Sequence, residues 1–306
     1  MAAPLLRTDG LTLRYPGGTT ALDGLSVEVP RASVGLVGAN GAGKTTLFRL
    51  ALGLLRPTRG HIEVVGLDVA DDPVAVRARL GFMPEHDCLA PDQTAADTVA
   101  TYGELSGLPP RSARQRASEV LDLVGLDEAR FRPVGGFSTG MKQRTKLAQA
   151  LVADPELLLL DEPTAGLDPL GREEMLALVG RLAGFGISVI VATHLLDDVQ
   201  RVCDEVVLID GGRLLHAGPT QALLSRTGSV RVELDAGADK LVAALAASGI
   251  AAIAVDDVTV DVPSDVPATL DAIRDCVDDL GLALHAMTSR RRSLDELFLG
   301  DLETVG

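Results

Sequence analysis

The strongest chemical signal in the sequence is a glycine-rich stretch that ends in a lysine and a threonine. Residues 38–45 read Gly-Ala-Asn-Gly-Ala-Gly-Lys-Thr and match the pattern GxxxxGK[ST]. An apolar run precedes the stretch and a helical pattern follows it, which is the context that this motif requires. Glycines let backbone N–H groups turn toward phosphate oxygens, and the helix N-terminus adds positive potential. We therefore predict a nucleotide site in which Lys44 reaches the β- and γ-phosphates and Thr45 places its hydroxyl on Mg²⁺.

Two adjacent carboxylates form the second signal. Asp161 and Glu162 directly follow the four leucines at 157–160. An uninterrupted apolar run between polar ends is typical of a buried parallel strand, and open α/β sheets bind ligands at the carboxyl ends of such strands. We predict that Asp161 holds Mg²⁺ and that Glu162 acts on the attacking water as general base or orienting group. Alone, such carboxylates are often solvated strand ends, so the prediction depends on the phosphate loop.

Apolar runs alternate with helical patterns around these motifs. The runs predicted as strands are residues 11–15, 25–29, 33–37, 61–65, 80–84, 157–160, 186–192 and 205–210. Strands that alternate with helices predict a doubly wound α/β core. Residues from about 86 to 152 are mostly helical and break the alternation, so we predict a helical subdomain inserted in the core.

The pattern changes near Thr227 and Gly228, where we place the end of a nucleotide-binding domain of residues 1–227. Residues 228–306 follow the order βαββαβ, which predicts a small ferredoxin-like domain. Residues 229–306 carry 15 acidic and 6 basic side chains, and so hold −9 of the net charge of −15. No nucleotide motif falls in this part. We predict a regulatory or dimer-stabilising role, with a structural spacer as the alternative.

Composition limits the classes of partner. The net charge of −15 argues against nucleic acid as the main partner, because phosphate backbones bind clustered Lys and Arg. The three cysteines lie far apart without a CxxC pair, which argues against a disulfide framework or a zinc site. The longest apolar run, residues 241–255, is shorter than the roughly 20 residues that span a bilayer. If the protein serves a membrane, another chain must supply the spanning part.

Further motifs follow in the order that the ABC (ATP-binding cassette) ATPase family has them, and the sequence therefore resembles that family. Residues 137–141, Phe-Ser-Thr-Gly-Met, are similar to the family signature Leu-Ser-Gly-Gly-Gln, and residues 165–168 resemble its D-loop. His194 follows a strand where the family has its switch histidine, and Tyr15 lies where the family stacks a ring on adenine. The resemblance covers about residues 5–225 and implies a RecA-like P-loop ATPase core with an antiparallel β subdomain.

The resemblance also implies a set of site residues, with Glu162 and His194 as the catalytic pair. The Mg²⁺ ligands would be Thr45, Glu85 and Asp161; Glu85 stands where most members of the family carry a glutamine. The residues implied to contact ATP are Tyr15, Gly38, Asn40, Gly41, Ala42, Gly43, Lys44, Thr45, Thr46, Ser138, Gly140 and Asp168.

Three positions depart from the family pattern. Thr139 and Met141 replace signature residues, whereas Ser138 and Gly140, which the family uses against the γ-phosphate, are present. The third departure is Glu85, which adds a negative charge near the γ-phosphate. The signature and the remaining motifs are therefore expected to build an intact site, with an altered charge at the glutamine position.

Within the family, the sequence looks like the ATPases of bacterial half-exporters, which pair with a separate six-helix permease. The segments that carry this likeness are residues 82–108, the signature and residues 288–299. The likeness implies a homodimer that closes head to tail on two ATP molecules, with Ser138 and Gly140 serving the opposite copy. The permease would dock near Glu85 and hold the protein at the cytoplasmic face of the membrane.

Three other functions compete with this interpretation. A soluble ABC-type ATPase of translation or iron–sulfur assembly is one, although the translation factors carry two cassettes and this chain has one phosphate loop. A DNA-repair ATPase would need a long coiled-coil insertion. A non-catalytic regulatory cassette is argued against by Glu162 and His194.

Overall fold

The computed structural model describes residues 4–263 and 266–291, so the segment 292–299 of the exporter likeness lies outside the described residues. Contacts divide the chain into two units, Met1–Gly218 and Pro219–Gly306. The compositional change at 227–228 marks the end of helix α8 (Thr220–Thr227), whereas the contacts group this helix with the second unit. The two boundaries therefore differ by this one helix.

The first unit is built on a six-stranded sheet of order β10-β9-β3-β8-β7-β6. Strand β3 pairs in parallel with β8 and β9, and β7 pairs in parallel with β6 and β8. Val37 lies beside Thr193, and Asp161 lies beside Ala192, so the ends of three strands meet at one edge. The strands are β3 (Ser33–Val37), β6 (Leu80–Met83), β7 (Leu157–Asp161), β8 (Ser188–Thr193), β9 (Glu205–Asp210) and β10 (Arg213–Pro219).

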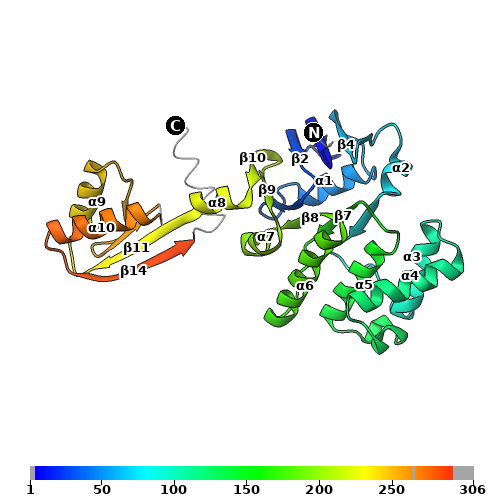
Figure 1. Cartoon of the computed structure of the whole chain (residues 1–306). Helices are drawn as coiled ribbons and strands as arrows, with labels where there is room; N and C mark the ends of the chain where they lie inside the picture. Colours follow the sequence, from blue (N-terminus) through cyan, green and yellow to red (C-terminus); the bar gives the residue numbers. More distant parts are fainter. Residues whose placement is uncertain (1–3, 264–265, 292–306) are drawn as a thin grey trace. The chain divides into compact units, whose positions relative to one another are not determined.

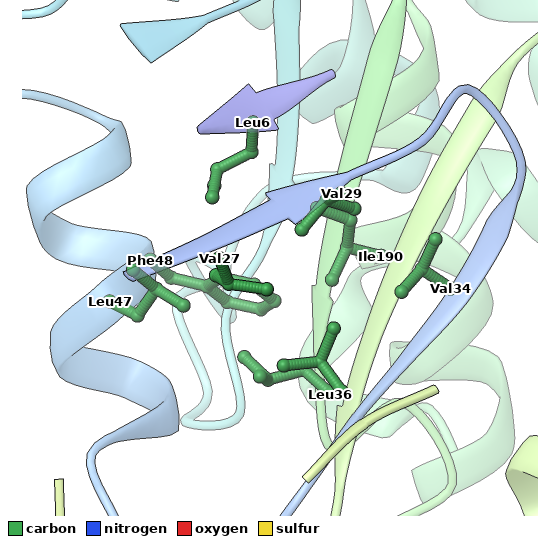
Figure 2. A pocket seen from close by; sticks show the side chains of 9 residues that line it. Leu6, Val27, Val29, Val34, Leu36, Leu47, Phe48 and Ile190 are labelled. Carbon is green, nitrogen blue, oxygen red and sulfur yellow. The ribbon is translucent and has the colours of Figure 1, made fainter. Parts of the chain in front are cut away.

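A second sheet of order β2-β1-β4-β5 is antiparallel and packs on helix α1 (Lys44–Ala51). Phe48 of α1 is fully buried in the hydrophobic core that joins this sheet to β3 and β8. A small cavity remains in this core. Because only apolar side chains line the cavity, it is a packing void and not a polar ligand site. Figure 2 shows its lining, which includes Leu6, Val27, Val34, Leu36, Leu47 and Phe48. The strands are β1 (Leu6–Arg14), β2 (Thr20–Val29), β4 (Arg59–Val64) and β5 (Leu67–Asp68).

Three helices form the inserted subdomain and pack on one another (Figure 1): α3 (Ala95–Leu105), α4 (Pro110–Leu123) and α5 (Thr139–Leu151). The break between α3 and α4 follows from Gly107, which has a φ of 97°, and from the two prolines that begin the next helix. The 3₁₀ turns Glu128–Phe131 and Val134–Gly136 connect α4 to α5. The prediction of a helical insertion in an α/β core is confirmed.

The other helices of this unit are α2 (Pro73–Arg77), α6 (Pro169–Leu182), the 3₁₀ turn Ala183–Phe185 and α7 (Leu196–Val202). In Figure 1, α1 lies on one side of β7 and β8, and α6 lies on the other. This is the layering of a doubly wound fold. Within the described residues, no helix has the length and apolar character needed to cross a bilayer.

The second unit contains an antiparallel sheet of order β12-β13-β11-β14. Its elements after α8 are β11 (Gly228–Leu234), α9 (Ala238–Ala247), β12 (Ile253–Ala254), β13 (Thr259–Val262), α10 (Pro267–Asp279) and β14 (Leu284–Arg291). Alternate residues of β11 and β13 join leucines of α9 and Ile273 of α10 in a separate hydrophobic core. This order and pairing are those of the predicted ferredoxin-like domain.

Candidate nucleotide-binding and catalytic site

The phosphate loop connects β3 to α1, and two of its glycines are required by close contacts. Gly43 has a φ of 108°, and a Cβ there would lie 2.6 Å from the carbonyl oxygen of Ala21. A Cβ on Gly38 would lie 2.3 Å from the carbonyl oxygen of Ile209. Larger residues would therefore displace the loop from the strands that support it. The loop ends at the N-terminus of α1, where helix geometry favours an anion.

Lys44 is the first residue of α1, and its side chain folds back on the loop. The ammonium Nζ donates hydrogen bonds to the carbonyl oxygens of Gly38 at 2.6 Å and Ala39 at 3.2 Å. It also lies 3.7 Å from Oε1 of Glu162. Both side chains of this ion pair are more than 90 % buried. The ammonium group of Lys44 therefore has three oxygen partners within its own chain.

Thr45 and Asp161 meet across the edge of the sheet. Thr45 Oγ1 donates a hydrogen bond of 2.9 Å to Oδ2 of Asp161, while Oδ1 of Asp161 is buried and has no hydrogen-bond partner in the described part of the chain. Burial raises the pKa of Asp161, and the hydrogen bond from Thr45 opposes that shift. An orphaned carboxylate oxygen beside a hydroxyl fits the oxygen ligands that Mg²⁺ prefers.

No group of three or more His, Cys, Asp or Glu residues suited to a metal ion occurs among the described residues. This agrees with the way Mg²⁺ is bound in nucleotide sites, where one or two protein oxygens combine with phosphates and water. The Thr45–Asp161 pair therefore fits a shared protein–nucleotide metal site rather than an all-protein one.

Glu162 follows Asp161 in a strained backbone conformation, with a φ of 48°. Its amide donates to the carbonyl of Ala192 at 2.9 Å. Its two carboxylate oxygens lie 3.0 and 3.1 Å from Nδ1 of His194, and Thr193 Oγ1 lies 3.4 Å from one of them. The turn after β7 thus directs the carboxylate between the lysine of the phosphate loop and the histidine that follows β8.

Tyr15 and Glu85 flank this centre. The Tyr15 hydroxyl lies 3.3 Å from Oγ1 of Thr46, which places the ring beside the start of α1. Glu85 follows β6 and is exposed. After burial, which is the main cause, the negative charge of Glu85 contributes to the raised pKa of Asp161. Tyr15 therefore lies beside the helix of the phosphate loop and Glu85 lies near Asp161, while their contacts with adenine and Mg²⁺ stay predictions.

Ser138, Gly140 and Asp168 lie elsewhere in the chain. Ser138 caps α5 by accepting the Met141 amide, and Asp168 caps α6 by accepting the Gly171 amide at 2.7 Å. Among the described residues, Ser138 has no hydrogen bond to the phosphate loop or to Glu162 of its own chain. Figure 1 shows α5 apart from α1. The structure thus brings the phosphate loop, the two carboxylates and His194 together, but not the signature.

Two buried charged residues were missed by the sequence interpretation. Asp198 of α7 is 1 % exposed; it accepts hydrogen bonds of 2.6 Å from Thr164 Oγ1 and from Arg172 Nε. It thereby joins the segment before the D-loop to α6 and α7. Lys146 of α5 is likewise buried. The only sequence signal for either is a charge at a helical position that otherwise faces a core.

Comparison with known proteins places this geometry in a family. Residues 22–165 match the family described as ABC transporter. The daunorubicin resistance ATP-binding protein DrrA3 of Streptomyces coeruleorubidus is 37 % identical over 307 residues, which cover 98 % of this chain and 96 % of that protein. The daunorubicin/doxorubicin resistance ATP-binding protein DrrA of Streptomyces peucetius is 39 % identical over 225 residues, covering 73 % of this chain and 68 % of that protein.

Solved structures agree with these relatives. The structure of cbiO1 of Clostridium perfringens, part of the ABC transporter complex cbiONQ, aligns with a TM-score of 0.66 and 30 % identity. The alignment covers 72 % of this chain and 90 % of that one. One relative matches this chain along nearly the whole length of both proteins, and the solved structures share its cassette fold. The chain therefore belongs to the ABC transporter family as an ATP-binding, ATP-hydrolysing subunit.

Proposed function

We propose that the chain powers export through a separate transmembrane permease, by closing as a homodimer on ATP and opening after hydrolysis. The observation that carries the proposal is the cluster of Lys44, Glu162 and His194 beside the Thr45–Asp161 pair. The full-length likeness to a daunorubicin resistance protein supports export as the direction of transport.

The residues of this cluster have distinct roles in the proposed reaction. Lys44 exchanges its loop carbonyls for β- and γ-phosphate oxygens of ATP, and Tyr15 stacks on the adenine. Thr45, Asp161 and Glu85 hold Mg²⁺, which when bound offsets phosphate charge. Glu162 takes the proton of the water that attacks the γ-phosphorus, and the bond to the bridging oxygen breaks to release ADP and phosphate.

His194 holds the general base in place. Its Nδ1 contacts both carboxylate oxygens of Glu162, so the histidine fixes the direction from which the carboxylate meets the water. A base held by a neighbour loses less orientation entropy when water and phosphate align. This role explains why the switch histidine and the carboxylate lie at the ends of neighbouring strands.

The second copy completes each site in this proposal. Ser138 and Gly140 lie at the N-terminus of α5, and Asp168 lies at the N-terminus of α6, where Ser138 and Asp168 accept the amides of Met141 and Gly171. Among the described residues, Ser138 has no hydrogen bond to the phosphate loop of its own chain, and in the proposed dimer it meets the γ-phosphate bound by a partner copy instead. A dimer closed on two ATP molecules uses both surfaces.

A separate permease supplies the membrane-spanning part, and the ATPase lies at the cytoplasmic face of the membrane against it. The first test is whether the neighbouring coding sequence encodes a protein with six apolar spans, and the second is reconstitution of such a protein with this chain in liposomes. We expect ATPase activity to increase when the two are combined, and the names of the daunorubicin resistance relatives make daunorubicin the first cargo to test. An unchanged activity with a correctly inserted permease would favour a soluble ABC-type ATPase not coupled to transport.

A further inference from the structure

A buried lysine outside every nucleotide motif connects α5 to the loop after β6. Lys146 is 3 % exposed, and its Nζ donates to the carbonyl oxygens of three consecutive residues. The distances are 2.7 Å to Pro84, 2.9 Å to Glu85 and 3.4 Å to His86. An ammonium group has three hydrogens, so these carbonyls match its donor capacity. One side chain of α5 thereby fixes three adjacent peptide groups of the Glu85 segment, residues 84–88.

The surroundings of this ammonium are negatively charged. Burial lowers the pKa of Lys146, because removal from water disfavours the charged form. The carboxylates that oppose the shift are Asp87, Glu85 and Asp161, whereas burial raises the pKa of the Cys88 thiol and leaves it uncharged. Backbone carbonyls alone do not neutralise a buried charge, so these acidic neighbours balance the lysine.

The carboxylates in turn need positive charge nearby. Asp161 and Glu162 are buried carboxylates at the end of β7, and Glu85 is near enough for its charge to act on Asp161. Lys44 faces Glu162 from the phosphate loop. A third carboxylate at position 85 adds negative charge where the phosphates of ATP would lie, and Lys146 is the buried cation that touches the segment carrying it.

We propose that Lys146 is a positioning residue of the nucleotide site: it holds the Glu85 segment near Asp161 and supplies the positive charge that a carboxylate at position 85 requires. The inference rests on the proposed role of Glu85 beside the bound nucleotide. An uncharged glutamine at position 85 would need the hydrogen bonds but not the charge. The energetic role of Lys146 therefore depends on which side chain stands at position 85.

A double-mutant cycle on the full-length chain tests the charge. The variants are Lys146→Met, Glu85→Gln and their combination, and the measurement is equilibrium binding of a non-hydrolysable ATP analogue with Mg²⁺ and with a chelator. We expect Lys146→Met to weaken binding in Mg²⁺ about tenfold and the double variant to recover most of this loss. A double variant as weak as Lys146→Met would overturn the charge role.

Amide hydrogen exchange without nucleotide tests the positioning role separately. Lys146→Met should speed exchange across residues 84–88, and Glu85→Gln should not reverse this, because the hydrogen bonds to the carbonyls remain lost. Unchanged exchange would overturn the positioning role. Because this measurement needs neither ATP nor a permease, its result is valid even if the chain proves not to be coupled to a permease. If the Met variant does not fold, Lys146→Gln, which keeps a donor without the charge, takes its place.

Lys142→Met is the matched control. Lys142 lies one turn earlier on α5, and its Nζ contacts Oδ2 of Asp87 at 2.9 Å. Its side chain is 33 % exposed, so solvent screens the pair. We expect nucleotide binding by Lys142→Met to stay within about twofold of the parent chain. An equal loss in both lysine variants would show a general effect of charge on α5 and would overturn the specific role of Lys146.

Discussion

Glu162 combines a left-handed backbone with a carboxylate that contacts a histidine and faces a lysine. A non-glycine residue at a φ of 48° is less stable by about 1–3 kcal/mol, and the surrounding structure must hold it there. Here the hydrogen bond from the Glu162 amide to the carbonyl oxygen of Ala192 and the contacts of the carboxylate with His194 do so. These contacts within the chain therefore hold the carboxylate of Glu162 in a fixed orientation.

The first prediction concerns this carboxylate. Glu162→Gln keeps the shape of the side chain but removes the base, so ATP should bind while turnover falls by roughly 10²-fold or more. Phosphate release at saturating ATP measures the turnover. Glu173→Gln, an exposed acid on α6, is the control and should be near the parent rate. Hydrolysis by Glu162→Gln near the parent rate would contradict the assignment of the base.

At the scale of secondary-structure elements, α6 and α7 are joined by Asp198. Asp198→Ala leaves Thr164 and Arg172 without their common acceptor, so we expect it to lower the free energy of unfolding by about 2 kcal/mol. Denaturant unfolding measures the loss. Asp197→Ala is the control, because Asp197 shares the first turn of α7 but is exposed. Equal effects of both substitutions would assign the loss to the helix terminus rather than to the hydrogen bonds.

The elements could be predicted where one physical rule dominates. Uninterrupted apolar runs identified β3 and β7, and the phosphate-loop pattern identified the turn into α1. Sequence spacing could not show that Lys146 reaches the carbonyls after β6, since its helix and that loop are joined only by the tertiary fold. The same applies to Asp198, whose partners lie 34 and 26 residues away.

The assignment of roles to Ser138 and His194 came from family resemblance rather than from their own surroundings. The structure adds a contact between His194 and Glu162, which the sequence did not reveal. For Ser138 it shows only a helix cap, because the partner copy that would use it is a separate chain. The shared site therefore stays a prediction.

At the scale of the whole molecule, that prediction can be tested with a mixed dimer of Lys44→Ala and Ser138→Arg chains. One site of the heterodimer would carry both lesions and the other neither. We expect ATPase activity to recover to about half of the parent value, whereas each homodimer stays inactive. Measurement on a purified heterodimer with two different tags is required. No recovery would count against sites shared between copies.

The second unit gives a further prediction. We propose that residues 228–306 are regulatory or dimer-stabilising, because the nucleotide motifs end by His194 and this unit has its own hydrophobic core. A chain that ends at Thr227 should still bind ATP, while its dimerisation or its activity with the permease should change. Sedimentation and coupled ATPase assays measure both. If binding, dimerisation and coupled activity all match the full-length chain, the unit is a spacer.

The hydrogen bonds of Lys44 to its own loop have a consequence for the speed of the catalytic cycle. A phosphate that enters must displace Gly38, Ala39 and Glu162 from the ammonium, so binding gains only the difference between the two sets of partners. The resident partners compete again once the γ-phosphate has left. They favour departure of ADP, and in the proposed cycle, in which the dimer opens after hydrolysis, an affinity limited in this way would help the products to leave.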